Sequence, residues 1–315
     1  MFRNKKMINF TLRSEEFRNH MQILVTGANG QLGRELQLEI PHSDIRSARV
    51  VAVDSAHCDI VDRRAVARLV GELHPDVIIN CAAYTAVDRA EAEPDRAEAV
   101  NCTGAANIAD AARRHDALMI HISTDYVFDG TRRIPYTEAD NPSPINVYGH
   151  TKLAGERAVS ESGCRNIIIR TQWLYSPFGH NFMKTMLELA RHRDRISVVC
   201  DQYGSPTTAA DLARAIVKIL SDSAGCRDIP CGIYNFASAG QASWYDFAKA
   251  IFELSGSSVE LLPIPTSEYP TAARRPQFSV LDTSLIRNRF GVTTPDWHDS
   301  LAETLRRLGD PENIL

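Results

Sequence analysis

The chain has 315 residues, with 35 basic and 39 acidic side chains and a formal net charge of −4. This length allows one large α/β domain and a smaller second domain. The nearly balanced charge gives no electrostatic footprint for nucleic acid or for an anionic membrane surface. No apolar stretch of the sequence approaches the roughly 20 residues that a membrane-spanning helix needs. We therefore expect neither a nucleic acid nor a membrane as a partner.

The first 20 residues are polar and show no periodic apolar pattern. Arg13, Glu15, Glu16 and Arg18 interrupt any apolar core of the kind that a secretory signal requires. We expect residues 1–20 to form a disordered N-terminal extension that is dispensable for activity, and the protein to be cytoplasmic. The seven cysteines are scattered without a C-x-x-C pair, which is typical of reduced thiols and not of a disulfide framework or a zinc site.

Short apolar runs alternate with helix-like stretches through the first half of the chain. The runs lie at Ile23–Val25 and begin again at Val50, Val77, Ala117 and Asn166. The helix-like stretches between them cover residues 63–73, 95–115 and 151–162. This alternation predicts βαβ units, and therefore an α/β fold with a Rossmann-like, doubly wound parallel sheet covered on both faces.

The pattern changes after Arg170. A helix is predicted at residues 181–191, followed by loops such as "DQYGSPTT" and the proline-spaced run "LLPIPTSEYPTAARRP". We expect residues 171–315 to form mainly a smaller C-terminal α/β domain that binds the substrate, with some segments returning to the first domain.

The stretch "TGANGQLG" places Gly27, Gly30 and Gly33 between a predicted strand and a predicted helix. Glycines there permit a tight turn and let backbone N–H groups approach a pyrophosphate. The spacing differs from the common G-x-G-x-x-G fingerprint, and glycines also serve turns that bind nothing. The strand-loop-helix setting favours a dinucleotide-binding domain over residues 21–170.

Polar and small residues follow the next predicted strands. Asp54 ends the second strand, where a carboxylate can accept hydrogen bonds from ribose hydroxyls; capping of a turn is an equally open reading of its position. Asp59 and Ile60 follow and could flank an adenine ring.

The third and fourth strands end in "NCAAYTAVD" and "HISTDYVFDG". Ligands of open parallel sheets lie beyond the carboxyl ends of the strands. We therefore expect Ala82, Ala83, Tyr84, Thr124 and Asp125 to line the same crevice as the glycine loop, although "STDYVFDG" could also be a polar loop that only closes a strand.

In "NVYGHTKLAGE", Tyr148 and Lys152 are four residues apart on the first turns of a predicted helix. Residues at this spacing share one helix face, so the phenol and the ammonium can meet. The pair alone is compatible with surface decoration or with an acid group.

Taken together, these motifs are similar to those of the extended short-chain dehydrogenase/reductase superfamily. The stretches "RTQWLYSPFGHNFMKTML", "DQYGSPT", "SWYDFA", "ARRPQFSVLDTSLI" and "PDW" resemble the dTDP-4-dehydrorhamnose reductase family within it. The resemblance extends from Met21 to about residue 308, and the first 20 residues have no counterpart.

The resemblance implies NAD(P)H-dependent reduction of the C4 ketone of dTDP-4-dehydro-L-rhamnose to dTDP-L-rhamnose, in biosynthesis of cell-surface polysaccharide. It implies a catalytic set of Tyr148 as proton donor, Lys152 as its orienting partner and Thr124 as the adjacent hydroxyl. The implied cofactor contacts are Gly27, Gly30, Gln31, Leu32, Gly33, Asp54, Asp59, Ile60, Ala82, Ala83, Tyr84, Tyr148 and Lys152. The implied sugar contacts are Thr124, Asp125 and Trp173. Without the resemblance, a core tryptophan would be the better reading of Trp173.

The resemblance leads to further expectations about charge. The ammonium of Lys152, with an oxidised nicotinamide nearby, should lower the pKa of Tyr148. Asp54 disfavours a 2′-phosphate, yet members commonly accept both NADPH and NADH, and we expect both to be used. Arg274 and Arg275 could meet the two phosphates of the dTDP group, or remain solvated.

Some members form a homodimer around Mg²⁺ that glutamates hold. Glu35 fits one such position, whereas Ala210 replaces another. The reaction itself needs no metal, so a bridging Mg²⁺ stays an open alternative at a dimer interface.

Two other functions share much of this pattern. A sugar-nucleotide epimerase or dehydratase would keep the tyrosine and lysine but retain its cofactor between turnovers. The regulatory subunit of methionine adenosyltransferase has a similar fold and acts only as a binding partner. The chain after Arg170 favours the reductase over the first, and the intact pair with Thr124 argues against the second.

Overall fold

The structure is a computed structural model that describes residues 20–45, 48–221 and 229–309. The predicted extension at residues 1–20 lies outside these ranges except for His20. The six cysteines within them are free thiols.

A six-stranded parallel sheet forms the centre of the molecule, in the order β2-β1-β3-β4-β5-β10. Its strands are β1 (Gln22–Thr26), β2 (Arg49–Val53), β3 (Val77–Asn80), β4 (Leu118–Thr124), β5 (Asn166–Thr171) and β10 (Gly232–Asn235). The strand order reverses between β1 and β3, which is where an open parallel sheet forms its ligand crevice. The predicted α/β class with a doubly wound parallel sheet is confirmed.

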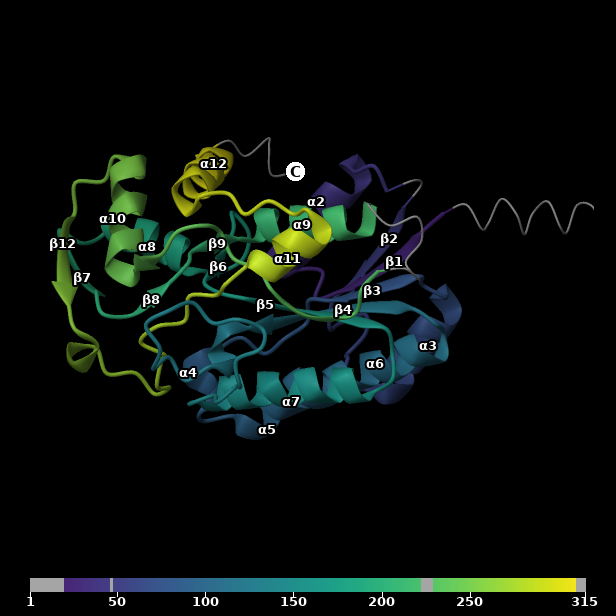
Figure 1. The fold of residues 1–315 in the computed structure, drawn as a ribbon. Coiled ribbons are helices and arrows are strands. Elements are labelled where there is room, and N and C mark those ends of the chain that lie inside the picture. The colour runs from purple at the N-terminus through teal and green to yellow at the C-terminus, as the bar shows by residue number, and fades with distance from the viewer. Residues whose placement is uncertain (1–19, 46–47, 222–228, 310–315) are drawn as a thin grey trace, which may run out of the picture.

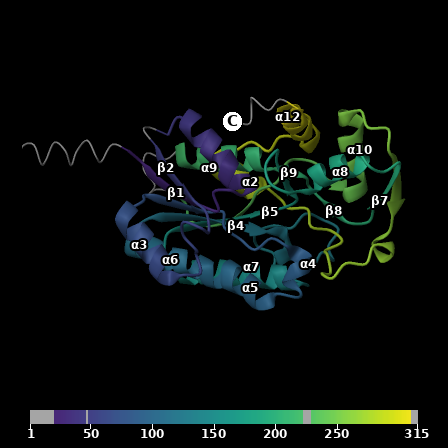
Figure 2. The same ribbon diagram turned by 180° about the vertical axis from the view of Figure 1, so that it is seen from behind.

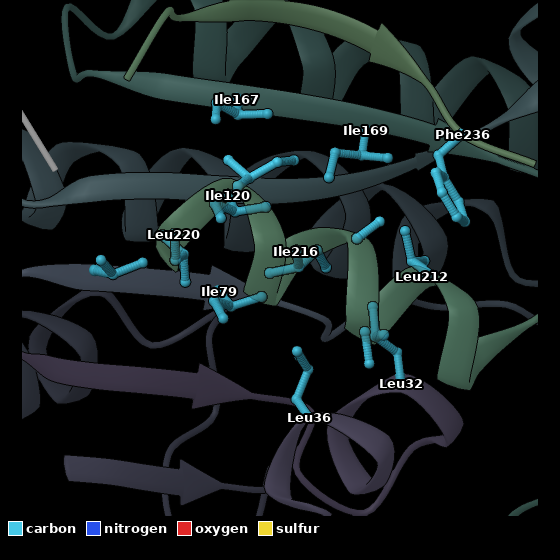
Figure 3. Close-up of a cluster of buried hydrophobic side chains, with 14 of the residues drawn as sticks. Leu32, Leu36, Ile79, Ile120, Ile167, Ile169, Leu212, Ile216, Leu220 and Phe236 are labelled. Atoms are coloured by element: carbon cyan, nitrogen blue, oxygen red, sulfur yellow. The ribbon is translucent and has the colours of Figure 1, made fainter. Parts of the chain in front are cut away.

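Helices cover both faces of this sheet, as Figures 1 and 2 show. One face carries α2 (Gln31–Glu39), α9 (Ala209–Ser221) and α11 (Ser284–Phe290); the other carries α3 (Arg63–Leu73), α6 (Ala105–Arg114) and α7 (Val147–Glu161). In Figure 3, Leu212, Ile216 and Leu220 of α9 lie against isoleucines of β3, β4 and β5. The strands read as continuous apolar runs because both their faces are buried.

The helix predicted at residues 95–115 is present as a continuous helical stretch over residues 94–114, with a π-helical segment inside it. The structure has α4 (Val87–Ala90), α5 (Pro94–Glu98), a π-helical turn η3 (Ala99–Gly104) and then α6. Pro94 begins α5, as its missing N–H requires. The wide turn holds Asn101, whose side chain accepts from the backbone N–H of Tyr84 and donates to the hydroxyl of Thr151 on α7.

The elements after β5 form three small two-stranded sheets and a second group of helices. The strand pairs are β7 (Arg195–Val199) with β12 (Glu260–Ile264), β8 (Tyr203–Gly204) with β11 (Ala242–Ser243), and β6 (Leu174–Tyr175) with β9 (Thr207–Thr208). The helices are α8 (Phe182–Ala190), α10 (Trp244–Ser255) and α12 (Trp297–Gly309), with one short 3₁₀ turn, η6 (Thr266–Glu268). Two further 3₁₀ turns, η2 (Ile40–His42) and η4 (Asp125–Val127), lie before β5 in the chain.

This second group has its own apolar core, built around Phe247, Ile251 and Leu301. It lies at one end of the central sheet (Figure 1). The chain nevertheless crosses back, because β10, α9 and α11 all belong to the central sheet and its covering layer. The carboxyl ends of the parallel strands therefore face the second group, and a cavity lies between them.

Candidate active site

The glycine loop joins the end of β1 to the start of α2. Gly27 has a φ of +70°, which favours glycine, and a Cβ there would lie 2.7 Å from the backbone nitrogen of Ala82. A Cβ at Gly33 would lie 2.3 Å from the carbonyl oxygen of Gly27. The loop is thus packed against its own helix and against the segment after β3, and only glycine fits at either position.

The start of α2 is suited to an anion. Its N-cap residue is Gly30, which has no side chain to cap the first turn. Four consecutive residues, 30–33, line the cavity here. Helix N-terminal N–H groups without an internal partner bind phosphate well, so this turn fits the pyrophosphate of a dinucleotide.

The cavity has a volume of about 600 Å³ and collects most of the predicted site. From the predicted set it is lined by Gly30, Gln31, Leu32, Gly33, Ala83, Thr124, Asp125, Tyr148, Lys152 and Trp173. The remaining predicted residues, Gly27, Asp54, Asp59, Ile60, Ala82 and Tyr84, do not line it. The predicted catalytic and sugar-binding residues thus come together with the glycine loop, whereas the predicted adenosine contacts Asp54, Asp59 and Ile60 lie apart.

The predicted adenosine contacts are placed along the side of β2. The carboxylate of Asp54 accepts from the side chain of Asn29 at 2.6 Å and contacts a ring nitrogen of His57 at 2.6 Å. Ile60 is buried in the core below, and Asp59 accepts from the backbone of Val61. Ala82 and Tyr84 flank the cavity-lining Ala83, and the hydroxyl of Tyr84 donates to Glu93. Both oxygens of Asp54 have partners within the protein, and Ile60 is an internal packing residue here.

Tyr148 and Lys152 lie on the first two turns of α7, as their spacing predicts. The ring of Tyr126 stands edge-on to Tyr148, with ring centroids 5.6 Å apart. Lys152 is only 2% exposed, and its ammonium donates to the carbonyl oxygen of Ile122 at 2.6 Å. Burial lowers the pKa of Lys152 to about 8, while the carboxylate of Glu156 opposes this shift.

The expected lowering of the pKa of Tyr148 by Lys152 and an oxidised nicotinamide stays a prediction, because it depends on the bound nicotinamide. Burial raises the pKa of Tyr148 to about 12; the hydrogen bond with Thr124 acts in the opposite direction, and the charge of Asp125 raises it further. The ammonium is held on the Ile122 carbonyl, so in this arrangement burial by the surrounding protein dominates the pKa of the phenol. Tyr148 is therefore protonated at neutral pH, which is the state that a proton donor requires.

An ion pair beneath this site was not predicted from the sequence. Arg170 of β5 and Glu156 of α7 are each 2% exposed and lie 2.7 Å apart. The hydroxyl of Ser123 also donates to Glu156, at 2.5 Å. Arg170 lies over the ring of Phe128. These contacts fix the central turn of α7 to the sheet, one turn beyond Lys152.

Asp125 follows Thr124 at the carboxyl end of β4 and is buried. Burial raises the pKa of Asp125 to about 7, although the hydroxyls of Ser279 and Thr124 oppose this shift. The Thr124 hydroxyl donates to Asp125 at 2.9 Å. A carboxyl group that is partly protonated near neutral pH can both donate to and accept from a sugar hydroxyl.

Trp173 lines the cavity opposite the catalytic helix. Its φ is +46°, unusual for a bulky residue and a sign of backbone strain at a site. Its indole stacks on Trp244, with centroids 3.6 Å apart and planes 8° from parallel. Trp244, which also lines the cavity, was not predicted. The signal was present in "SWYD", because Ser243 and Asp246 form a capping box that starts α10 at Trp244.

Neither arginine of "ARRP" lines the cavity. Arg275 instead forms an ion pair with Asp88 at 2.6 Å. A role for these arginines on the dTDP phosphates finds no support in this arrangement.

A magnesium site involving Glu35 also finds no support. Glu35 is fully buried and pairs with Arg307 at 2.8 Å, and Ala210 is a buried residue of α9. Among the described residues, no group of three or more His, Cys, Asp or Glu side chains could hold a metal ion. Within the same ranges, no helix is both long and apolar enough to cross a membrane.

Comparison with known proteins matches residues 21–309 to the family described as "RmlD substrate binding domain". A dTDP-4-dehydrorhamnose reductase of Burkholderia thailandensis is 41% identical over 299 residues, covering 91% of this chain and 99% of that protein.

Solved structures agree with these matches. The crystal structure of a dTDP-4-dehydrorhamnose reductase from Clostridium acetobutylicum has a TM-score of 0.87 and 42% identity, and covers 92% of this chain and 100% of that one. The crystal structure of a dTDP-4-dehydrorhamnose reductase from Bacillus anthracis, in complex with NADP, has a TM-score of 0.86 and 40% identity. It covers 91% of this chain and 99% of that one.

The sheet, the glycine loop and the tyrosine-lysine helix define an oxidoreductase of the extended short-chain dehydrogenase/reductase type. The chain belongs to the dTDP-4-dehydrorhamnose reductase family.

Proposed function

We propose that the protein reduces the C4 ketone of dTDP-4-dehydro-L-rhamnose with NADPH or NADH, giving dTDP-L-rhamnose for cell-surface polysaccharide. The observation that carries this proposal is the meeting of Thr124, Tyr148 and Lys152 with the glycine loop in one cavity. The names of the relatives supply the substrate. An enzyme of this biosynthesis would work in the cytoplasm, as the sequence predicts.

In this reaction, different residues of the cavity would have different roles. A bound nicotinamide would supply the hydride. Tyr148, neutral at physiological pH, donates its proton to the carbonyl oxygen as that oxygen gains charge. The Thr124 hydroxyl lies beside the phenol and can polarise the same oxygen. Lys152 places a buried positive charge one turn below Tyr148, where it can hold the ribose next to the nicotinamide.

The two parts of the chain would hold the two ligands. We propose that residues 21–170 bind the cofactor, with the start of α2 on its pyrophosphate and Asp54 on its ribose. Residues 171–315 would mainly bind the sugar nucleotide, with Trp173 stacked on the sugar face and Asp125 on its hydroxyls. Segments around β10 and α9 return to the first unit and support the sheet.

Incubation of the purified protein with dTDP-4-dehydro-L-rhamnose tests the proposal. We expect loss of the reduced-nicotinamide absorbance and formation of an equal amount of dTDP-L-rhamnose, identified by chromatography and mass spectrometry. A UDP-linked keto-sugar is the matched control for the nucleotide. Absence of turnover with the dTDP substrate, or turnover that consumes no external reduced nicotinamide, would contradict the proposal and favour an epimerase.

The same assay gives the cofactor preference. The Asp54 carboxylate disfavours the 2′-phosphate of NADPH, but it is already engaged by Asn29 and His57. We therefore expect both cofactors to be used, with values of kcat/KM that differ by less than about a thousandfold, or roughly 4 kcal/mol. A larger ratio in either direction would show that the ribose end of the site is selective.

A further inference from the structure

The side chain of Asn146 makes hydrogen bonds in two directions. It is the N-cap residue of α7, and its Oδ1 accepts from the backbone N–H of Gly149 at 2.8 Å. Its Nδ2 donates to the carbonyl oxygen of Arg274 at 2.7 Å, across 128 residues of sequence. The side chain is 4% exposed. One buried amide therefore joins the first turn of the catalytic helix to a segment of the C-terminal half.

That segment, residues 273–278, is attached to the first half of the chain at its two ends. At one end, Asp88 of α4 accepts from the backbone N–H of Ala273 at 3.1 Å and pairs with Arg275. At the other end, the backbone N–H of Phe278 donates to the carbonyl oxygen of Gly130 at 3.2 Å. The bond from Asn146 meets the segment between these attachments.

Tyr148 is the second residue of α7, directly within the turn that Asn146 caps. A helix end without its cap loses a partner for one of its free N–H groups and frays. The phenol can deliver a proton only from hydrogen-bond distance of the carbonyl oxygen. Its placement thus depends on the same side chain that holds the segment.

We propose that Asn146 is a positioning residue for the proposed reduction, which couples the segment 273–278 to the catalytic turn so that Tyr148 is held against the substrate. This inference rests on the proposed function for its kinetic part. Asn146 touches neither the reacting atoms nor the cofactor in this role; it acts through the position of Tyr148.

Two substitutions separate the two bonds. Asn146→Ser keeps a good N-cap, because a serine hydroxyl can accept from Gly149, but it is too short to reach Arg274. Asn146→Ala removes both bonds. Asp296→Ala is the matched control, because Asp296 accepts from the backbone N–H of His298 at the start of α12, away from the cavity.

Hydrogen exchange at single amides gives a readout that does not depend on activity. In Asn146→Ser we expect exchange at Ala273 and Phe278 to become faster by about tenfold, with Gly149 unchanged. In Asn146→Ala all three amides should exchange faster. In Asp296→Ala all three should keep their wild-type rates.

The kinetic readout is kcat with the dTDP keto-sugar. Misplacement of a reacting group by about 1 Å can cost up to roughly 10²-fold, so we expect kcat to fall about tenfold in Asn146→Ser and further in Asn146→Ala. KM for NADPH should stay within about twofold of wild type, because the glycine loop is untouched.

A serine variant with wild-type kcat overturns the positioning role, whether or not its exchange rates change. Wild-type exchange at Ala273 and Phe278 in that variant overturns the coupling. A wild-type protein that does not turn over the keto-sugar contradicts the proposed function instead, and the exchange rates then still decide the coupling.

Discussion

The two sides of the cavity are built in different ways. The cofactor side consists of backbone and small residues that are close in sequence, with the loop from Gly27 to Gly33 packed on itself and on the end of β3. The proposed sugar side consists of large side chains held by partners far away in sequence, such as Trp173 on Trp244. Local packing makes the first side tolerant of side-chain changes elsewhere, whereas the second side should respond to single side chains.

Tyr148 lies where the two sides meet, and its loss should have the largest effect. Tyr148→Phe removes one oxygen and keeps the ring against Tyr126. General acid catalysis contributes about 10² to 10⁴-fold, and we expect a loss of that order in kcat with the dTDP keto-sugar. Binding of NADPH, followed by its fluorescence, should change little. A variant with near wild-type turnover would show that the phenol is not the proton donor.

The ion pair of Glu156 and Arg170 supports the catalytic helix from the sheet side. Glu156→Gln leaves a buried guanidinium without a counter-charge, and we expect the free energy of unfolding to fall by about 3–5 kcal/mol. Urea unfolding followed by circular dichroism measures this change.

An exposed pair provides the control. Glu188 and Arg191 lie 3.1 Å apart on α8 with side chains 59% and 73% exposed. Glu188→Gln should change the free energy of unfolding by no more than about 1 kcal/mol. If Glu156→Gln and Glu188→Gln lower the free energy of unfolding equally, the buried pair of Glu156 and Arg170 does not stabilise α7 as its burial indicates.

Much of the cofactor side could be predicted from the sequence, because its signals are local. The apolar runs predicted the strands of the central sheet, and the motif "TGANGQLG" predicted the glycine loop and the start of α2. The ends of the strands also placed Thr124 at the crevice, and the family resemblance placed Tyr148 beside it. The helix at residues 95–115 was predicted, but its π-helical segment was not, because Asn101 in that segment bonds to Thr151 on another helix.

The sugar side could be predicted only in part. Trp173 was found through family resemblance, but its stacking on Trp244 joins two elements with no shared sequence pattern. The ion pair of Arg275 with Asp88 likewise depends on how the C-terminal half folds back, and the sequence left a phosphate contact and a solvated charge as open alternatives. The raised pKa of Tyr148 in the protein alone could not be predicted, because the surroundings of the phenol and the bond from Lys152 to Ile122 are tertiary features.

Asp125 should make the stability of the protein depend on pH. Its pKa is raised from 3.8 to about 7 in the folded state, so the folded protein binds a proton more tightly than the unfolded chain. This contribution to stability is fully present below about pH 4 and is lost as the pH rises through 7. Asp125→Asn removes the buried charge. The free energy of unfolding of this variant, relative to that of wild type, should therefore rise as the pH rises from about 4 through 7.

The expected gain is up to about 4 kcal/mol at pH 8, since one pKa unit corresponds to about 1.4 kcal/mol. Urea unfolding of both proteins at pH 5, 6, 7 and 8 measures it. Asp129→Asn is the control, because hydrogen bonds with Thr131 lower the pKa of that carboxylate and its loss should not become more favourable as the pH rises. A difference between wild type and Asp125→Asn that stays constant with pH would contradict the raised pKa.

The smallest effect should come from the tryptophan stack, and it should be confined to the sugar side. Trp244→Leu keeps an apolar residue at the start of α10 but removes the ring on which Trp173 lies. An aromatic pair contributes about 0.5–1.5 kcal/mol beyond its buried area, which corresponds to roughly a 2 to 12-fold change. Because Trp173 would then be less firmly held over the sugar, we expect KM for the dTDP keto-sugar to rise by that factor. KM for NADPH should not change, since the loop at Gly30 is formed by local packing and shares no contact with the stack. If both KM values rise together, the two sides of the cavity are not built independently, and the contrast between them fails.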